Sequence, residues 1–301
     1  MVSLPFEIYF TFVIEEKWGF NKTTASTFVV DKIKGFALMT ILTSIFLSAI
    51  LYTIESCGDN LLFYLSVLTI SIIVLLQILV PLVIIPCFYT YSDLEEGKLR
   101  TDIFNESEKT KIPVSQIKVI DGSKRSSHSN AFVSGFGPFR KVVIFDTLLE
   151  QQTPEEILAV VNHELGHVAH FHIIWNIIAS SMQIVFMFSL FTLCVDNKDM
   201  LRSFGFDHHT GFLYLFVFQT LYSPFQIFVQ FIVMHFTRSC EYQADRFAVT
   251  YGHGENLKKA LLQLFKKNKG ALIVDSFYSM LNNSHPTLME RLKAIDAQLK
   301  K

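Results

Sequence analysis

VNHELGHVAHFH, residues Val161–His172, contains the motif H-E-x-x-H at His163–His167. Side chains four residues apart lie on the same face of a helix, so His163 and His167 can point at one metal ion. Two histidines at this spacing are typical of zinc metalloproteases, in which the glutamate that follows the first histidine, here Glu164, acts on a zinc-bound water. Because the motif is short, its interpretation depends on the rest of the chain.

The composition indicates a membrane protein. Half of the 301 residues are hydrophobic, 30 of them are Phe, and the mean hydropathy is +0.37. A chain this apolar is unlike an ordinary soluble enzyme. The net charge of −1 offers no basic face and excludes a nucleic-acid partner.

Four apolar stretches are each long enough to cross a bilayer, which takes roughly 20 helical residues. They are Phe36–Ile54, Leu61–Ile85, Ile173–Val195 and Gly211–Phe236. Proline inside the second and the fourth, at Pro81 and Pro224, predicts kinks in those helices.

The charges of the links orient these spans. Links 55–60 and 196–210 contain few Lys or Arg, whereas residues 90–172 and the tail after Phe236 are rich in both. Basic residues are retained on the cytosolic side of a membrane. The N-terminus, the segment with His163 and the tail are therefore expected on that side, with the first 34 residues as an amphipathic segment on the membrane or on the main domain.

Residues Thr90–Val161 read as a soluble insertion. Glu95–Phe104 is expected to be helical, and Gln116–Ile120 and Val142–Phe145 are short apolar strands with a polar, Gly- and Ser-rich loop between them. Thr153 and Glu156 can form a capping box with Pro154 in the first turn, so a helix is expected to begin there and to present His163 and His167 together.

A third metal ligand is available in the tail. Thr237–Tyr251 reads as a further helix on which Glu241 and Asp245 lie one turn apart. One carboxylate can bind zinc while the other accepts a hydrogen bond from a ligand imidazole. The alternative is a solvated helix face paired with neighbouring arginines. His170 is interpreted as a surface or interfacial histidine, and His172 receives no role. A final amphipathic helix is expected at Leu288–Leu299.

The chain resembles the integral-membrane zinc CaaX prenyl endopeptidases (type I CaaX prenyl proteases), which process farnesylated mating pheromone in yeast and prelamin A in animals. The resemblance rests on separated stretches that follow the family's order over essentially the whole chain: LPFEIYFTFVIEEKWGFNK at Leu4–Lys22, EGKL at Glu96–Leu99, GSKRSSHSNAF at Gly122–Phe132, VIFDTLLE at Val143–Glu150, HELGH at His163–His167, EYQAD at Glu241–Asp245 and SHPTLMERL at Ser284–Leu292. Their number and order make the resemblance far more specific than H-E-x-x-H alone.

The resemblance implies roles for individual residues. His163, His167 and Glu241 would be the zinc ligands, and Glu164 the catalytic base. Asp245 would be the carboxylate that supports a ligand from behind. His285 and Arg291 would be a C-terminal pair that contacts the substrate or the developing oxyanion. The stretch with Asn130, Ala131 and Phe132 would form the edge strand along which the peptide is laid. An exposed edge can hold an extended peptide through main-chain hydrogen bonds.

The resemblance also implies a fold with seven membrane helices around a large chamber. Only four spans are visible here, so the chain is expected to lack N-terminal membrane helices of the family. It further lacks, at Glu150–Pro154, a long charged insertion that some animal members carry.

Together these observations predict a mainly α, polytopic membrane protein with a small α+β zinc metallopeptidase domain inserted between spans. Four segments are expected: residues 1–89 with two spans, 90–172 with the edge strand and the HExxH helix, 173–236 with two further spans, and 237–301 with the third ligand.

The predicted function is zinc-dependent cleavage of C-terminal CaaX peptides from prenylated proteins by attack of a zinc-bound water. The protein would lie in the endoplasmic reticulum and inner nuclear membranes, in contact with lipid, with its site reached from the cytosol. The alternatives are a quality-control metalloprotease for misfolded or translocon-jammed proteins, and a shortened, non-catalytic zinc-binding scaffold. A transporter is disfavoured because the spans contain almost no charge.

Overall fold

A computed structural model describes residues 3–195, 197–208, 210–270 and 274–300. The chain packs into two units that alternate along the sequence. Unit 1 consists of residues 1–33, 81–172 and 237–301, and unit 2 of residues 34–80 and 173–236. The described part is mainly helical with one small mixed sheet, which confirms the predicted fold class.

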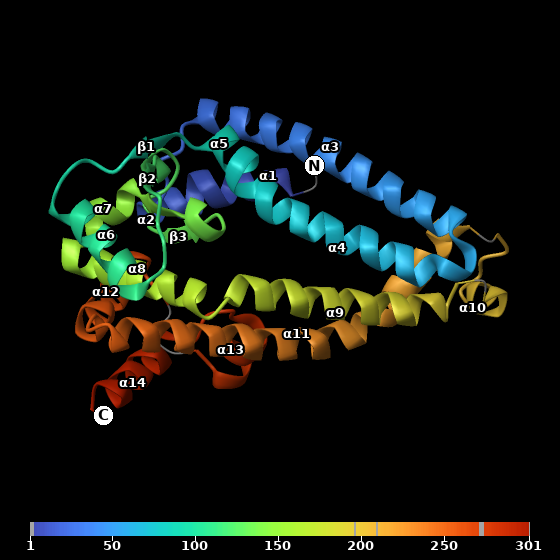
Figure 1. The fold of residues 1–301 in the computed structure, drawn as a ribbon. Helices are drawn as coiled ribbons and strands as arrows, with labels where there is room; N and C mark the ends of the chain where they lie inside the picture. Colours follow the sequence, from blue (N-terminus) through green and yellow to red (C-terminus); the bar gives the residue numbers. More distant parts are fainter. Residues whose placement is uncertain (1–2, 196, 209, 271–273, 301) are drawn as a thin grey trace. The chain divides into compact units, whose positions relative to one another are not determined.

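The sheet of unit 1 has four short strands in the order β1-β2-β4-β3. Figure 1 labels β1, β2 and β3. The strands are β1 (Tyr91–Asp93), β2 (Gln116–Ile120), β3 (Ala131–Ser134) and β4 (Lys141–Phe145). β2 and β4 are parallel, and the other two pairs are antiparallel. The two predicted strands are confirmed as β2 and β4. Among the described residues β3 pairs with β4 alone, so one of its edges is open there.

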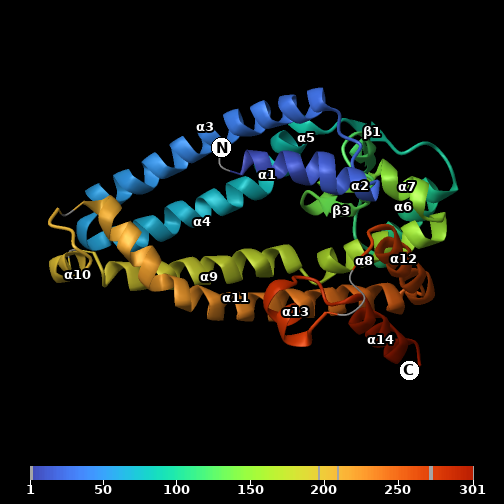
Figure 2. The same ribbon diagram turned by 180° about the vertical axis from the view of Figure 1, so that it is seen from behind.

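Several helices of unit 1 pack on this sheet or on other helices (Figures 1 and 2). They are α6 (Lys98–Thr110), α7 (Asp146–Gln151), α8 (Pro154–Ala169), α12 (Gly254–Lys267), α13 (Ser276–Asn282) and α14 (Leu288–Leu299). α7 contacts β4 and α8 contacts β3, whereas α6 and α12 pack on α8 and α14 packs on α12. Ile103, Ile144, Leu148 and Leu165 are almost fully buried together. α8 begins at the capping box predicted for Thr153 and Glu156. The capping box thus sets the start of α8, and apolar packing stabilises the helix along its length.

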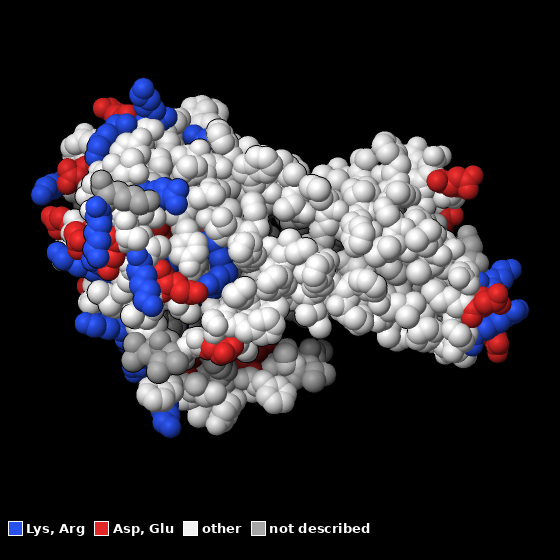
Figure 3. Space-filling model, turned by 90° about the horizontal axis from the view of Figure 1, so that it is seen from below, with Lys and Arg blue, Asp and Glu red and all other residues white. Residues whose placement is uncertain are grey.

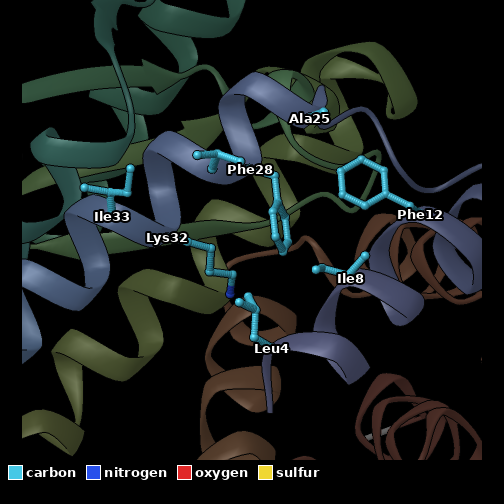
Figure 4. A pocket seen from close by; sticks show the side chains of 8 residues that line it. Leu4, Ile8, Phe12, Ala25, Phe28, Lys32 and Ile33 are labelled. Carbon is cyan, nitrogen blue, oxygen red and sulfur yellow. The ribbon is translucent and has the colours of Figure 1, made fainter. Parts of the chain in front are cut away.

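The N-terminal segment is short and helical rather than a span. α1 (Leu4–Tyr9) continues through a π-helical stretch, η1 (Phe10–Glu15), into α2 (Glu16–Trp18). It faces the first turns of α3 (Ala25–Ser56) across an apolar cavity of about 530 Å³ (Figure 4). Leu4, Ile8, Phe12, Ala25, Phe28, Val29, Lys32 and Ile33 line the cavity. No candidate site residue is among them.

In the described parts of the chain, four helices are long and apolar enough to cross a membrane, as predicted. They are α3, the continuous α4 (Leu61–Leu79), η3 (Val80–Ile84) and α5 (Ile85–Phe88), α9 (His172–Thr192), and α11 (Gly211–Thr250). Pro81 lies in the π-helical turn η3. The prediction of a separate helix at Thr237–Tyr251 is wrong, because α11 runs through it without a break. No glycine interrupts the chain between Gly211 and Gly252, whose positive φ of 91° ends the helix.

Unit 2 is apolar inside and outside. Leu65, Phe191, Leu201 and Val217 are fully buried in its core. Leu201, on α10 (Lys198–Ser203), packs in the same cluster as Leu61 and Leu65, which brings the two links between spans to one end of the unit. On the face shown in Figure 3, the charged side chains of unit 2 lie at that end, and the surface of its helices is white because it carries no charged residues. This distribution suits helices whose outer surfaces contact lipid.

Candidate metal centre

The two histidines of the motif lie side by side on α8. His163 is buried and His167 half-buried, and their Nε2 atoms are 3.2 Å apart. The glycine between them, Gly166, has a packing role that sequence analysis did not assign. A Cβ at Gly166 would lie 2.9 Å from the Cα of Ala244. The glycine therefore lets α8 approach the C-terminal part of α11 closely enough for their side chains to share one site.

Glu241, on α11, completes a three-atom cluster with the histidines. Its Oε2 lies 3.6 Å from His163 Nε2, and its Oε1 lies 3.4 Å from His167 Nε2. The three residues form a group whose ligand atoms all lie within 4.8 Å of one another. Tetrahedral ligands about 2.0–2.1 Å from one zinc ion are about 3.3 Å from each other. The spacing and the N2O donor set therefore fit a divalent metal ion with an open fourth position.

The buried carboxylate supports this fit. Glu241 is 3% exposed, and its Oε2 accepts no hydrogen bond of good geometry, although His285 Nδ1 lies 2.8 Å away. A buried carboxylate oxygen without a hydrogen bond is unfavourable unless a cation completes its environment. A metal ion between Glu241 and the two histidines would provide that cation.

Asp245 and Arg291 hold the first histidine from behind. Asp245 is fully buried, and its Oδ1 lies 2.9 Å from His163 Nδ1. The Nδ1–H of His163 can donate to this carboxylate, which leaves Nε2 unprotonated and directed at the metal site. Arg291, on α14, donates to both oxygens of Asp245 at 2.9 and 2.6 Å. The carboxylate is thereby neutralised and its orientation fixed.

Burial and neighbouring charges shift the pKa values of the motif residues strongly. Burial lowers the pKa of His163, but hydrogen bonds with Asp245 and Glu241 raise it to about 9. Burial and the adjacent positive His163 lower the pKa of His167 to about 3. Without metal the pair therefore carries one positive charge, which a divalent ion would replace.

Glu164 and His285 border the same cluster. Burial, together with the negative charge of Glu241, raises the pKa of Glu164 to about 7. A carboxyl group with a pKa near neutrality can both accept and release a proton. His285 follows α13 and is largely exposed, with only its Nδ1 directed at Glu241. His285 is thus accessible to a substrate, whereas Glu164 is partly buried and Asp245 is fully buried.

The predicted peptide-binding stretch lies at the start of the open edge strand. Ala131 and Phe132 are the first residues of β3 and pair with Ile144 and Val143 of β4. Asn130 directly precedes β3 and accepts the amide of Phe145 at 3.0 Å with its carbonyl oxygen. β3 also contacts α8, the helix with the two histidines. The edge strand and the metal cluster therefore belong to one packed unit.

Two residues near the cluster were not found from sequence. His172 Nδ1 lies 2.9 Å from His167 Nδ1, and His172 Nε2 lies 3.1 Å from Gln243 Oε1. The spacing of five residues from His167 is not a helical spacing, so no periodicity could have indicated this contact. His170, in contrast, has the exposed side chain expected of a surface histidine.

The sequence matches two family models. Residues 93–299 match "Peptidase family M48", and residues 1–90 match "CAAX prenyl protease N-terminal, five membrane helices". The chain is 38% identical to a CAAX prenyl protease 1 homolog of Arabidopsis thaliana, over all of this chain and 71% of that protein. It is 36% identical to the CAAX prenyl protease 1 of Saccharomyces cerevisiae, over 98% of this chain and 69% of that protein.

A human relative and a solved structure agree with these matches. The chain is 34% identical to a CAAX prenyl protease 1 homolog of Homo sapiens, over 98% of this chain and 70% of that protein. Its fold is similar to the crystal structure of S. mikatae Ste24p, with a TM-score of 0.92 and 36% identity over 98% of this chain and 72% of that one.

Proposed function

Because this chain belongs to peptidase family M48 and to the CAAX prenyl proteases within it, we propose that it is a zinc-dependent endopeptidase that removes C-terminal CaaX peptides from prenylated proteins. That it is a multi-pass membrane metalloendopeptidase follows from the family and the four apolar helices. The identity of the metal, the substrate and the role of each residue belong to the proposal.

The observation that carries the proposal is the cluster of His163, His167 and Glu241 in the same unit as an open edge strand. Two imidazoles and one carboxylate are a common ligand set of catalytic zinc in peptidases. When bound there, zinc supplies a Lewis acid that polarises the scissile carbonyl and acidifies a water molecule.

The remaining steps of the reaction are carried out by side chains of this protein. Glu164 receives the proton of the attacking water at its carboxylate and passes it to the leaving amine, as its pKa near 7 permits. His285 and Arg291 contact the substrate or the oxyanion, while Arg291 also fixes Asp245. The extended peptide adds to the open edge at Asn130–Phe132 through main-chain hydrogen bonds.

Replacing the proposed base tests this assignment. Glu164→Gln keeps the size of the side chain and removes its basic carboxylate. In the purified full chain we expect bound zinc, measured by elemental analysis, to stay near one per molecule. Cleavage of a farnesylated CaaX peptide should fall by about 10²–10⁴-fold.

The control is Glu155→Gln in the exposed first turn of the same helix, which should leave cleavage unchanged. Cleavage by Glu164→Gln at the rate of the unmodified protein would remove Glu164 from the mechanism.

The open edge strand favours a second substrate class. Because edge-strand binding reads the main chain, it accepts peptides with little regard to side chains, as a quality-control peptidase for misfolded or translocon-jammed proteins would require. A farnesylated peptide and its unprenylated twin separate the two roles. A prenyl-specific enzyme should cleave only the first efficiently, and equal rates would favour the broader role.

The proposed location is the endoplasmic reticulum and inner nuclear membranes, with the site reached from the cytosol. The support is the distribution of Lys and Arg: residues 90–172 and the tail are rich in both, whereas the links of unit 2 contain few. An impermeant thiol reagent applied to sealed microsomes tests this orientation. It should label a cysteine introduced at the exposed Glu155, and absence of labelling until the membrane is opened would reverse the topology.

A further inference from the structure

We propose that His172 and Gln243 are positioning residues that fix the ring orientation and the tautomer of His167, the second histidine of the metal cluster. The inference rests on the proposed function, because it takes His167 as a metal ligand. His172 and Gln243 would hold His167 in the way that Asp245 holds His163.

The chain makes an unusual turn to place His172 there. α8 ends at Ala169, and Phe171 adopts a left-handed conformation with φ of 56° before α9 begins at His172. This conformation is unfavourable by roughly 1–2 kcal/mol for a bulky residue. The turn returns the chain toward α8, so that His172 is 3% exposed and its ring meets that of His167. His170 and Phe171, the two residues before it, are both exposed.

The hydrogen-bond roles in this chain of residues are mutually consistent. His167 Nε2 faces Glu241 and His163, and a nitrogen that ligates a metal carries no proton. A neutral His167 therefore carries its proton on Nδ1 and can donate it to His172 Nδ1, 2.9 Å away. His172 then carries its own proton on Nε2 and donates it to Gln243 Oε1 at 3.1 Å. Each donor meets an acceptor, and only one tautomer of each ring allows this.

The C-terminal part of α11 thus anchors both histidines. Glu241 is a ligand, Asp245 accepts from His163 directly, and Gln243, between them, holds His167 through His172. The two supports differ in charge. A carboxylate paired with Arg291 stands behind His163, whereas a neutral imidazole and an amide stand behind His167.

The competing interpretation is that His172 merely fills space in the turn. A purely structural residue would affect stability and leave metal affinity unchanged when replaced by a side chain of similar bulk. Residues that orient metal ligands through hydrogen bonds typically change metal affinity by 10–100-fold. Zinc affinity, measured without any substrate, therefore distinguishes the two interpretations.

The experiment uses the purified full chain and competition for Zn²⁺ with a chromophoric chelator. His172→Leu should bind zinc about 10–100-fold more weakly than the unmodified protein. His172→Asn should bind close to normally, because Asn Oδ1 occupies nearly the position of His Nδ1 and can accept from His167. His170→Leu is the matched control, since this exposed ring stacks on His172 but reaches no ligand, and its affinity should not change.

Variants of Gln243 independently test the other end of the hydrogen-bond chain from His167 through His172. Gln243→Leu leaves the donor of His172 without its acceptor and should weaken zinc binding by a few-fold, whereas Gln243→Glu retains an acceptor and should restore it. Thermal unfolding of each variant shows whether it is folded. If His172→Leu does not fold, the His172→Asn and Gln243 variants still test the inference.

The inference is wrong if folded His172→Leu or the Gln243→Leu variant binds zinc like the unmodified protein, or if His170→Leu weakens binding as much as His172→Leu. A failure of the proposed function looks different. In that case the zinc-loaded unmodified protein does not cleave a farnesylated CaaX peptide, whatever the zinc affinities of the variants.

Discussion

The two units bury different kinds of residues. In the described part of the chain, the buried polar residues of unit 2 are Thr53 and Ser66, and no charged residue of that unit is buried. Unit 1 buries His163, Glu241 and Asp245 in one connected network. Unit 1 also buries Glu106 and Arg238, which form ion pairs with Lys109 and Glu290. The comparison teaches that, among the described residues, charge is buried in unit 1 alone, where a metal site or a partner of opposite charge can compensate it. In unit 2 apolar packing suffices, with many apolar side chains left on the surface for lipid.

The largest contrast between the units should come from removing a buried carboxylate. Glu241→Ala deletes the candidate third ligand, so we expect zinc affinity to fall by more than about 100-fold and peptide cleavage to be abolished. Chelator competition and cleavage of a farnesylated peptide measure both effects. Glu55→Ala, at an exposed carboxylate in the last turn of α3 in unit 2, is the control and should change neither. Normal zinc binding by Glu241→Ala would exclude this residue as a ligand.

A matched pair of leucines tests whether burial stabilises the units equally. Leu148 in unit 1 and Leu65 in unit 2 are both at most 1% exposed. Leu148→Ala should destabilise unit 1 by about 2–5 kcal/mol. The variant loses the free energy of transferring the leucine side chain out of water, and it also loses the packing contacts of that side chain. Leu65→Ala should have a smaller effect of about 1–2 kcal/mol, because lipid is as apolar as the unit's core and only packing is lost.

Hydrogen exchange read by mass spectrometry follows peptides of each unit separately and can measure both leucine variants. Equal destabilisation of the two units would show that unit 2 does not gain its stability as a lipid-exposed bundle does.

An ion pair within unit 1 should have an intermediate effect. Arg125 donates two hydrogen bonds to Asp31 at 2.7 and 3.0 Å, stacks on Tyr89, and lies in the loop that leads to β3. Asp31→Asn should loosen this loop by about 1–2 kcal/mol, seen as faster hydrogen exchange at residues 121–130. Asp59→Asn, in an exposed link of unit 2, should leave exchange unchanged. Unchanged exchange in Asp31→Asn would show that the loop is held by other contacts.

The smallest expected effect is on the pH dependence of stability, and it involves Glu290 of the helix α14. Partial burial favours a higher pKa for Glu290, but hydrogen bonds from Thr287 and Arg238 lower it below its ordinary value of 4.5. Because the folded-state pKa is lower, this contribution is present above pH 4.5 and is lost as pH falls through the folded-state pKa. After solvent screening it amounts to about 0.2–1 kcal/mol.

Unfolding of Glu290→Gln followed below pH 5 should show a flatter pH dependence than that of the unmodified protein. An identical dependence in both proteins would remove Glu290 as a contributor.

Local patterns predicted much of the fold. The lengths of the apolar stretches predicted four spans, short apolar runs on either side of a Gly- and Ser-rich loop predicted β2 and β4, and Thr153 with Glu156 predicted the start of α8. Each of these features depends on neighbouring residues alone. The break expected before Thr237 was wrong because a change from apolar to charged residues does not by itself end a helix, and even Pro224 lies inside α11 without ending it.

Within the site, the sequence determined which residues can share a helix face: His163 with His167, and Glu241 with Asp245. The family resemblance suggested that the two pairs meet. Only the tertiary structure decided how they do so. The absence of a side chain at Gly166 lets α8 approach Ala244, and the left-handed turn at Phe171 returns His172 to His167. Neither contact follows a helical or strand period, because both depend on how the backbone turns and packs between elements distant in sequence.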